Sequence, residues 1–92
     1  MNTRNNALEV AEFAMENGIV KAQEDETLYY VYGPMDNGDL KICLKWEKTD
    51  GTDGKRDVVI PLDAIRKALN VNAYWEADPY NGGEKFLIVP MD

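Results

Sequence analysis

The stretch LKICLKWEK, residues 40–48, decides the fold, because apolar and polar residues alternate along it almost without a break. A β-strand places alternate side chains on opposite faces. One face would be apolar and would carry Leu40, Ile42, Leu44 and Trp46. The other would be mostly charged and would carry Lys41, Cys43, Lys45 and Glu47. This pattern predicts a strand of an antiparallel sheet, with only one face buried.

The segments on either side of this strand predict a three-stranded antiparallel meander. Residues 27–33 form a strand that ends at Gly33 and Pro34, and MDNGD, residues 35–39, has turn chemistry. Strict alternation predicts that the core receives Leu28, Tyr30 and Tyr32, while Tyr29 and Val31 lie on the opposite face. The polar loop TDGTDGK then leads into a third strand over residues 55–60.

Two helices are expected. The first covers residues 6–17, with Asn6 as N-cap, Glu9 completing a capping box, and Asn17 and Gly18 at the C-terminal end. Its apolar residues cover a broad arc, predicting that most of its girth is buried, and its acidic stripe carries Glu9, Glu12 and Glu16. The second helix begins at Pro61, which suits a first turn, and runs to residue 70.

Two more strands are predicted near the C-terminal end, over residues 71–77 and 85–89, separated by the loop DPYNGG. The sequence therefore predicts one α+β domain over residues 1–92. It has an antiparallel sheet of about five strands and two helices, in the order α-β-β-β-α-β-β.

The composition argues against an enzyme. The 92 residues include no histidine and no serine, so the commonest general base and the serine nucleophile are both absent. Cys43 is the only cysteine, which excludes an intramolecular disulfide and favours a reducing, cytoplasmic location. We expect no signal peptide in MNTRNNALEV, and no apolar run approaches the roughly 20 residues of a membrane span.

Four local patterns resemble functional sites, and each is better explained without chemistry. TDGTDG, residues 49–54, lacks the ligand spacing of a calcium loop, and NGG, residues 81–83, lacks the lysine and helix of a phosphate loop. Cys43 has no histidine base, and the carboxyls of Glu76 and Asp78 are one chance pair among many acids. We therefore predict no catalytic residue, no metal and no cofactor.

Charge is the most informative feature of the sequence. The net charge is −7, with 17 acids against 10 bases. Residues 1–39 hold eight acids and two bases, and so carry nearly all of it. Such a field repels nucleic acid and anionic membranes and attracts a basic protein surface. The acids could equally serve only solubility.

These observations support the hypothesis of a small, non-enzymatic acidic binding protein. It would block a basic nucleic-acid-binding surface on another protein, with carboxylates in place of phosphates. Phage-carried inhibitors, such as anti-CRISPR and anti-restriction proteins, are similar in size and charge. The alternative is a general interaction or accessory domain, which could be a homodimer. The expected partner-binding residues are Glu9, Glu12, Glu16, Glu24, Asp25, Glu26 and Tyr29.

Overall fold

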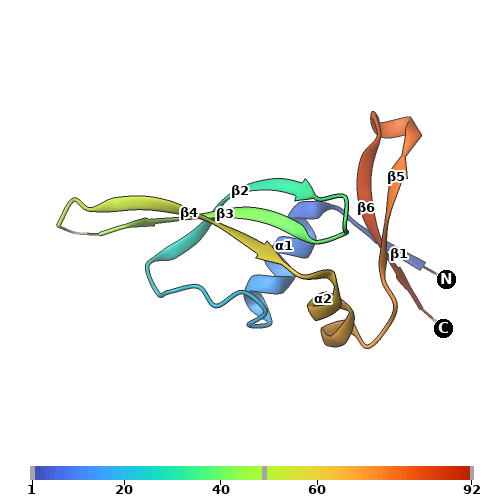
Figure 1. The fold of residues 1–92 in the computed structure, drawn as a ribbon, viewed down its shortest axis with the longest axis horizontal. Coiled ribbons are helices and arrows are strands. Elements are labelled where there is room, and N and C mark those ends of the chain that lie inside the picture. The colour runs from blue at the N-terminus through green and yellow to red at the C-terminus, as the bar shows by residue number, and fades with distance from the viewer. Residues whose placement is uncertain (1, 49, 92) are drawn as a thin grey trace.

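A computed structural model describes residues 2–48 and 50–91, which form two helices and six strands in two antiparallel three-stranded sheets (Figure 1). The meander sheet has the order β2-β3-β4, with bounds Glu26–Pro34, Leu40–Glu47 and Asp53–Ile60. The terminal sheet has the order β1-β6-β5, with bounds Asn2–Asn5, Glu84–Pro90 and Tyr74–Asp78. The helices are α1, Ala7–Glu16, and α2, Leu62–Leu69, and a 3₁₀ turn covers Pro79–Asn81.

The α+β class, the two helices and the antiparallel pairing are confirmed, but the prediction of about five strands in one sheet is not exact. The structure adds β1, and it divides the strands between two sheets. β1 pairs with β6 from Asn2 opposite Pro90 to Asn5 opposite Leu87. Its sequence, NTRN, has no apolar alternation. It forms a strand because its backbone groups pair with those of β6, and its own residues do not predict a strand.

The prediction for β3 is confirmed, because its apolar row is the centre of the core. Leu40, Ile42 and Leu44 are 0% exposed. They define the inner face of the meander sheet, which α1 covers through Val10 and Ala14. Figure 1 shows both helices on one side of this sheet, while the β3–β4 hairpin extends past them.

The outer half of the hairpin depends on one large ring rather than on the helices. Trp46, half-buried at the end of the same row, lies against Gly54, the residue opposite it on β4. Any side chain at position 54 would collide with the indole ring. The projecting hairpin therefore has its own small contact, which glycine alone permits.

The predicted facing of β2 is wrong, because two irregularities interrupt its alternation. In the pairing with β3, Leu28 is opposite Leu44, Tyr30 is opposite Cys43 and Val31 is opposite Ile42, so the register shifts around Tyr29. A second shift comes between Val31 and Gly33. A β-bulge adds one residue to one strand and reverses the facing of the residues after it. The core therefore receives Leu28 and Val31, whereas Tyr30 and Tyr32 are 57% and 51% exposed.

Helix α1 begins as predicted, since the side chain of Asn6 accepts from the Glu9 backbone N–H and the Glu9 carboxylate accepts from the Asn6 N–H. It ends at Asn17, and Gly18 has a positive φ of 70°. The predicted breadth of the buried arc is wrong, because Leu8 is 49% exposed. The helix meets the sheets with a narrower face, made of small residues that allow close approach.

Two hydrogen bonds join the terminal sheet and α2 to the meander sheet. The indole N–H of Trp75 donates to the carbonyl of Gly38 at 2.8 Å. The carboxylate of Asp39 accepts from the backbone N–H of Leu62 at 2.9 Å. This second contact caps α2, because Pro61 at its N-cap provides no side-chain acceptor. The turn between β2 and β3 therefore connects the meander sheet to α2 and to the terminal sheet.

Truncation of Leu44 to alanine should lower the free energy of unfolding by about 2–5 kcal/mol, because it leaves a cavity in the closed inner face. Leu8→Ala removes the same atoms from a position that is 49% exposed, and should cost much less. Urea unfolding followed by tryptophan fluorescence measures both. Equal losses for the two variants would contradict the assignment of β3 as the centre of the core.

Candidate functional site

The residues expected to bind a partner do not form one site. Five acids lie on or just after α1, Glu26 is buried, and Tyr29 lies on the other side of the meander sheet. Glu9, Glu12 and Glu16 lie along α1, and all three side chains are exposed. The segment after α1 carries Glu24, which is exposed, and Asp25, which is half-buried. This segment lies on the same side of the meander sheet as α1 (Figure 1). We call these five residues the acidic surface.

Among the described residues, no basic group pairs with a carboxylate of the acidic surface. None of the five forms an ion pair within residues 2–48 and 50–91. The one intramolecular role found among them is that of Glu9, whose Oε1 accepts from the Asn6 N–H at 3.2 Å. The acidic surface is therefore open to a cation from outside the chain.

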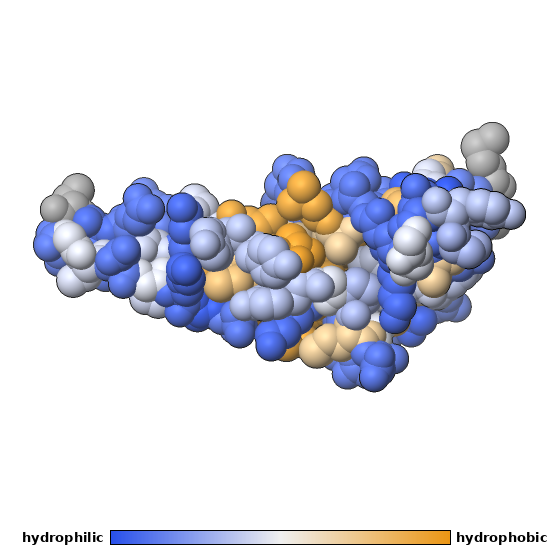
Figure 2. All heavy atoms as spheres, turned by 90° about the horizontal axis from the view of Figure 1, so that it is seen from above, coloured by the Kyte–Doolittle hydropathy of each residue, from blue (hydrophilic) through white to orange (hydrophobic). Residues whose placement is uncertain are grey.

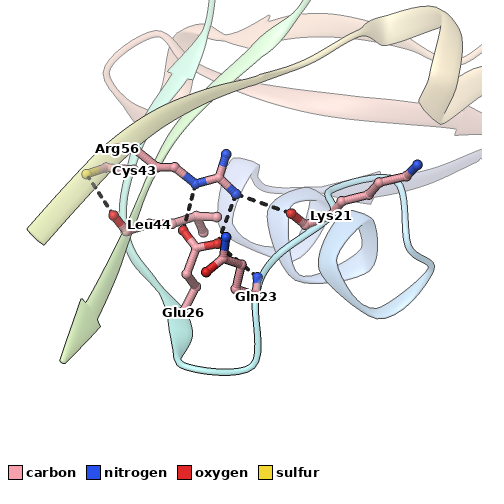
Figure 3. Close-up of polar contacts among 6 residues, drawn as sticks. All are labelled: Lys21, Gln23, Glu26, Cys43, Leu44 and Arg56. Atoms are coloured by element: carbon pink, nitrogen blue, oxygen red, sulfur yellow. Dashed lines mark hydrogen bonds and ion pairs between the residues drawn. The ribbon is translucent and has the colours of Figure 1, made fainter. Parts of the chain in front are cut away.

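Glu26 differs from these acids, although it directly follows Asp25 in the sequence. Figure 3 shows its bonds within the chain. Its side chain is 3% exposed, and Arg56 donates to it from Nε at 2.7 Å and from Nη2 at 3.0 Å. The backbone N–H of Gln23 adds a third bond at 2.8 Å. These bonds, that from Arg56 foremost, lower the pKa of Glu26 below its ordinary value. Both oxygens are already used within the chain, so Glu26 holds the start of β2 to β4.

Arg56 is placed for this role by the register of β4. It is opposite Leu44, so it lies in the inner row of the meander sheet, beyond the part covered by α1. Its Nη2 also donates to the carbonyl of Lys21 at 3.2 Å. The bond to Glu26 raises the pKa of Arg56 in turn. In the sequence, Arg56 is only one of ten bases, and nothing there indicates this pairing.

Tyr29 lies on the other side of the meander sheet from α1, in a group of side chains that we call the outer face. The alternation of β3 and the bulges of β2 bring this group together. Its members are Tyr29, Tyr30, Tyr32, Lys41, Cys43, Lys45, Glu47, Asp53, Lys55, Asp57 and Val59. The structure thus does not bring Tyr29 together with the acids of α1.

Lysines and tyrosines alternate in contact across the outer face. The ammonium groups of Lys55 and Lys45 lie 4.4 and 5.4 Å from the centre of the Tyr29 ring. Lys41 lies 4.9 Å from the centre of the Tyr32 ring. The rings of Tyr30 and Tyr32 meet edge to face at 5.0 Å. Such contacts hold the rings in place, with lysines over those of Tyr29 and Tyr32.

Asp57 and Cys43 complete the middle of the outer face. The hydroxyl of Tyr32 donates to Asp57 at 3.0 Å, and this bond raises the pKa of Tyr32. Cys43 lies on the outer face, as the alternation of residues 40–48 predicts, but its own side chain is only 4% exposed. The tyrosines that the bulges direct outward lie on the face of this thiol, and position 43 does not provide an accessible nucleophile.

Part of the outer face is predictable from the sequence. The pattern of residues 40–48 directs Lys41 and Lys45 away from the core. The exposure of Tyr30 and Tyr32 is not predictable in this way, because the two bulges leave no distinct mark in ETLYYVYGP. Tyr29 is exposed as expected, at 51%, but its two neighbouring tyrosines are no less exposed.

The terminal sheet has a hollow of about 360 Å³ on the side lined by Arg4, Glu76, Asp78 and Tyr80. Asp78 accepts from Arg4 at 2.6 Å, from the Tyr80 N–H at 2.9 Å and from Asn81 at 2.7 Å. These bonds, that from Arg4 foremost, lower the pKa of Asp78. The carboxylate thus closes the β5–β6 turn and stays ionised, which does not suit a general acid.

The described residues hold no group of three or more side chains suited to bind a metal ion. Nor do they include a helix with the length and apolar character that crossing a bilayer requires. No protein-family model matches the sequence, and no curated protein or solved structure is significantly similar to it. The acidic surface and the outer face are therefore the two features from which a function can be inferred.

Glu26→Gln should destabilise the protein at neutral pH, because it weakens the bonds from Arg56. A lowered pKa means that the ionised form stabilises the fold above the ordinary glutamate pKa of about 4.3. That contribution disappears as the pH falls through the lowered pKa. Urea midpoints measured from pH 7 to pH 3 should show the difference from wild type shrinking toward zero.

Glu24→Gln is the matched control, because it makes the same change two residues away on an exposed side chain. It should leave the midpoint nearly unchanged throughout the pH range. A Glu26→Gln variant as stable as wild type at pH 7 would contradict the structural role of this pair.

Proposed function

We propose that the protein is a small, non-enzymatic binding protein whose acidic surface occupies a basic, nucleic-acid-binding surface of another protein. The observation that carries this proposal is the absence of ion pairs, among the described residues, at all five carboxylates of the acidic surface. Arg and Lys side chains of a bound partner would supply positive charges to these carboxylates, which no described base of this chain does.

The contrast with the rest of the chain supports the proposal. Five other acids lie between 2.6 and 3.8 Å from a basic group, and they are Glu26, Glu47, Asp57, Asp63 and Asp78. Six more described acids outside the acidic surface also lack an ion pair, but they are spread over residues 36–84, whereas the acidic surface gathers five unpaired acids within residues 9–25. A face needed only for solubility would tolerate the same pairing.

The geometry of α1 suits the replacement of phosphates. Glu9, Glu12 and Glu16 are spaced by three and four residues, so they lie on one side of the helix and span about 10 Å of its axis. The helix is fixed by its capping box and by Val10 and Ala14 in the core. Rigid placement lowers the entropy that the carboxylates lose on binding.

A second candidate function is a general interaction or accessory domain in which the acids serve only solubility. The observation that favours it is the exposure of aromatic side chains remote from the acidic surface. Tyr80 is 95% exposed, and the tyrosines of the outer face are more than half exposed. Tyrosine is enriched at protein interfaces, because it combines contact area with a polar tip.

Replacing Glu9, Glu12 and Glu16 together by glutamine should abolish capture of a nucleic-acid-binding protein from a host lysate at 0.15 M salt. Gln retains the capping function at position 9, so α1 should stay folded. Capture by wild type should be reversed by an added nucleic acid oligonucleotide, because the two would compete for the same basic groups. Mass spectrometry and immunoblotting of the eluate measure both effects.

The control variant carries Asp36→Asn, Glu76→Gln and Glu84→Gln, which remove the same three charges from exposed positions on separate elements. It should still capture the partner, with at most a few-fold loss from the weaker overall field. The proposal fails if wild type retains no nucleic-acid-binding protein, or if both triple variants behave alike.

A further inference from the structure

The charges of the outer face lie in rows across β3 and β4, and the sign of the charge alternates from one row to the next. Each row joins a residue of β3 to the residue opposite it on β4, and in order the rows are Lys41 with Val59, Cys43 with Asp57, Lys45 with Lys55 and Glu47 with Asp53. The row charges are thus +1, −1, +2 and −2. They cancel, although the whole chain carries −7.

Two of these rows place like charges opposite each other, which destabilises the sheet of a single molecule. Lys45 is directly opposite Lys55, and Glu47 is directly opposite Asp53. Like charges facing each other across a sheet are destabilising. The Tyr29 ring partly offsets the first pair, since both ammonium groups lie near it. The pairs Lys41–Asp57 and Lys45–Glu47, at 3.8 and 3.6 Å, are exposed and worth little.

We propose that a second copy of this chain packs on the outer face, so that the two meander sheets meet face to face with their strands antiparallel. A two-fold axis across the strands at the level of Leu44 would bring the row of Lys41 onto the row of Glu47 and Asp53 of the other copy. It would also bring the row of Asp57 onto the row of Lys45 and Lys55. Every charged row would then face a row of opposite sign.

The aromatic side chains suit this arrangement. The same axis places β2 of one copy over β2 of the other, so their tyrosines meet between the sheets. Tyr29, Tyr30 and Tyr32 are 51%, 57% and 51% exposed, and Val59 is 46% exposed, so this face has apolar area left to bury. Within residues 2–48 and 50–91, the hydroxyls of Tyr29 and Tyr30 have no hydrogen-bond partner, and they remain as donors.

Other occupants fit the outer face less well. A nucleic acid needs a positive field and open ring faces, but the rows sum to zero and lysines lie over Tyr29 and Tyr32. An acidic peptide would meet the row of Glu47 and Asp53 as well as the lysines. Figure 2, seen from above Figure 1, shows hydrophobic residues gathered near the middle and hydrophilic ones along the hairpin, without one continuous apolar groove.

The area of the outer face limits the affinity expected of the dimer. The three strands, of nine, eight and eight residues, measure about 14 by 26 Å at ordinary strand spacing and rise. This footprint, about 360 Å² per copy, lies below the roughly 800 Å² per partner of a standard interface, so we expect a weak, reversible dimer with a dissociation constant of roughly 100 µM. The dimer is independent of the proposed function, because the acidic surface lies on the other side of the meander sheet.

A charge-swap experiment tests the axis directly. Sedimentation velocity in 0.15 M salt, from about 5 to 500 µM, should show wild type passing from monomer to dimer. Lys41→Glu alone and Glu47→Lys with Asp53→Lys should each weaken the homodimer by roughly tenfold or more, because rows of like sign would then meet. An equimolar mixture of these two variants should dimerise to within roughly threefold of wild type, because their rows are again complementary.

Lys85→Glu is the control, since it makes the same change of charge on β6 of the terminal sheet and should leave dimerisation unchanged. Thermal melts show whether each variant is folded, and recovery in the mixture cannot come from unfolded chains. The proposal is overturned if wild type stays monomeric to 500 µM, or if the mixture does not recover. A monomer whose outer-face amide resonances shift on adding poly-glutamate or a 12-nucleotide oligo-dT overturns it in favour of those ligands.

Discussion

The structure depends on the one-sided burial of β3. Leu40, Ile42 and Leu44 are fully buried, and β3 is the strand of its sheet that pairs on both sides. Because side chains alternate, burying this row forces Lys41 and Lys45 onto the opposite face. The helices can then cover the inner face only. The core and the outer face are therefore two consequences of one alternating strand.

This dependence explains which parts of the fold can be predicted from the sequence. The pattern of β3 is unbroken over residues 40–47, so its facing is predictable, and the capping box of α1 is equally local. In β2, packing against β3 decides between burying tyrosines and burying Leu28 with Val31. A bulge at Tyr29 costs little backbone pairing and keeps the bulky rings out of a small core.

The candidate site is less predictable, because function depends on which charges are paired. Glu24 and Glu26 are two residues apart and look alike in the sequence, yet one is exposed and the other is bonded to Arg56. Their difference arises from a contact across 30 residues. Composition gives the sum of the charges, whereas folding decides which of them remain available. Within residues 1–39, folding removes Glu26 from the acids that an outside cation can reach.

The acidic surface and the outer face lie on opposite sides of a single sheet, and this separation links the two proposals. A second copy bound at the outer face would leave α1 uncovered in both molecules. The dimer would then present two acidic surfaces directed away from each other. Two such surfaces could bind two basic partners, or two sites of one assembly, and a linked second site raises avidity without any new contact. A weak dimer would thus add to a partner's affinity, since partner binding at both ends holds the pair together.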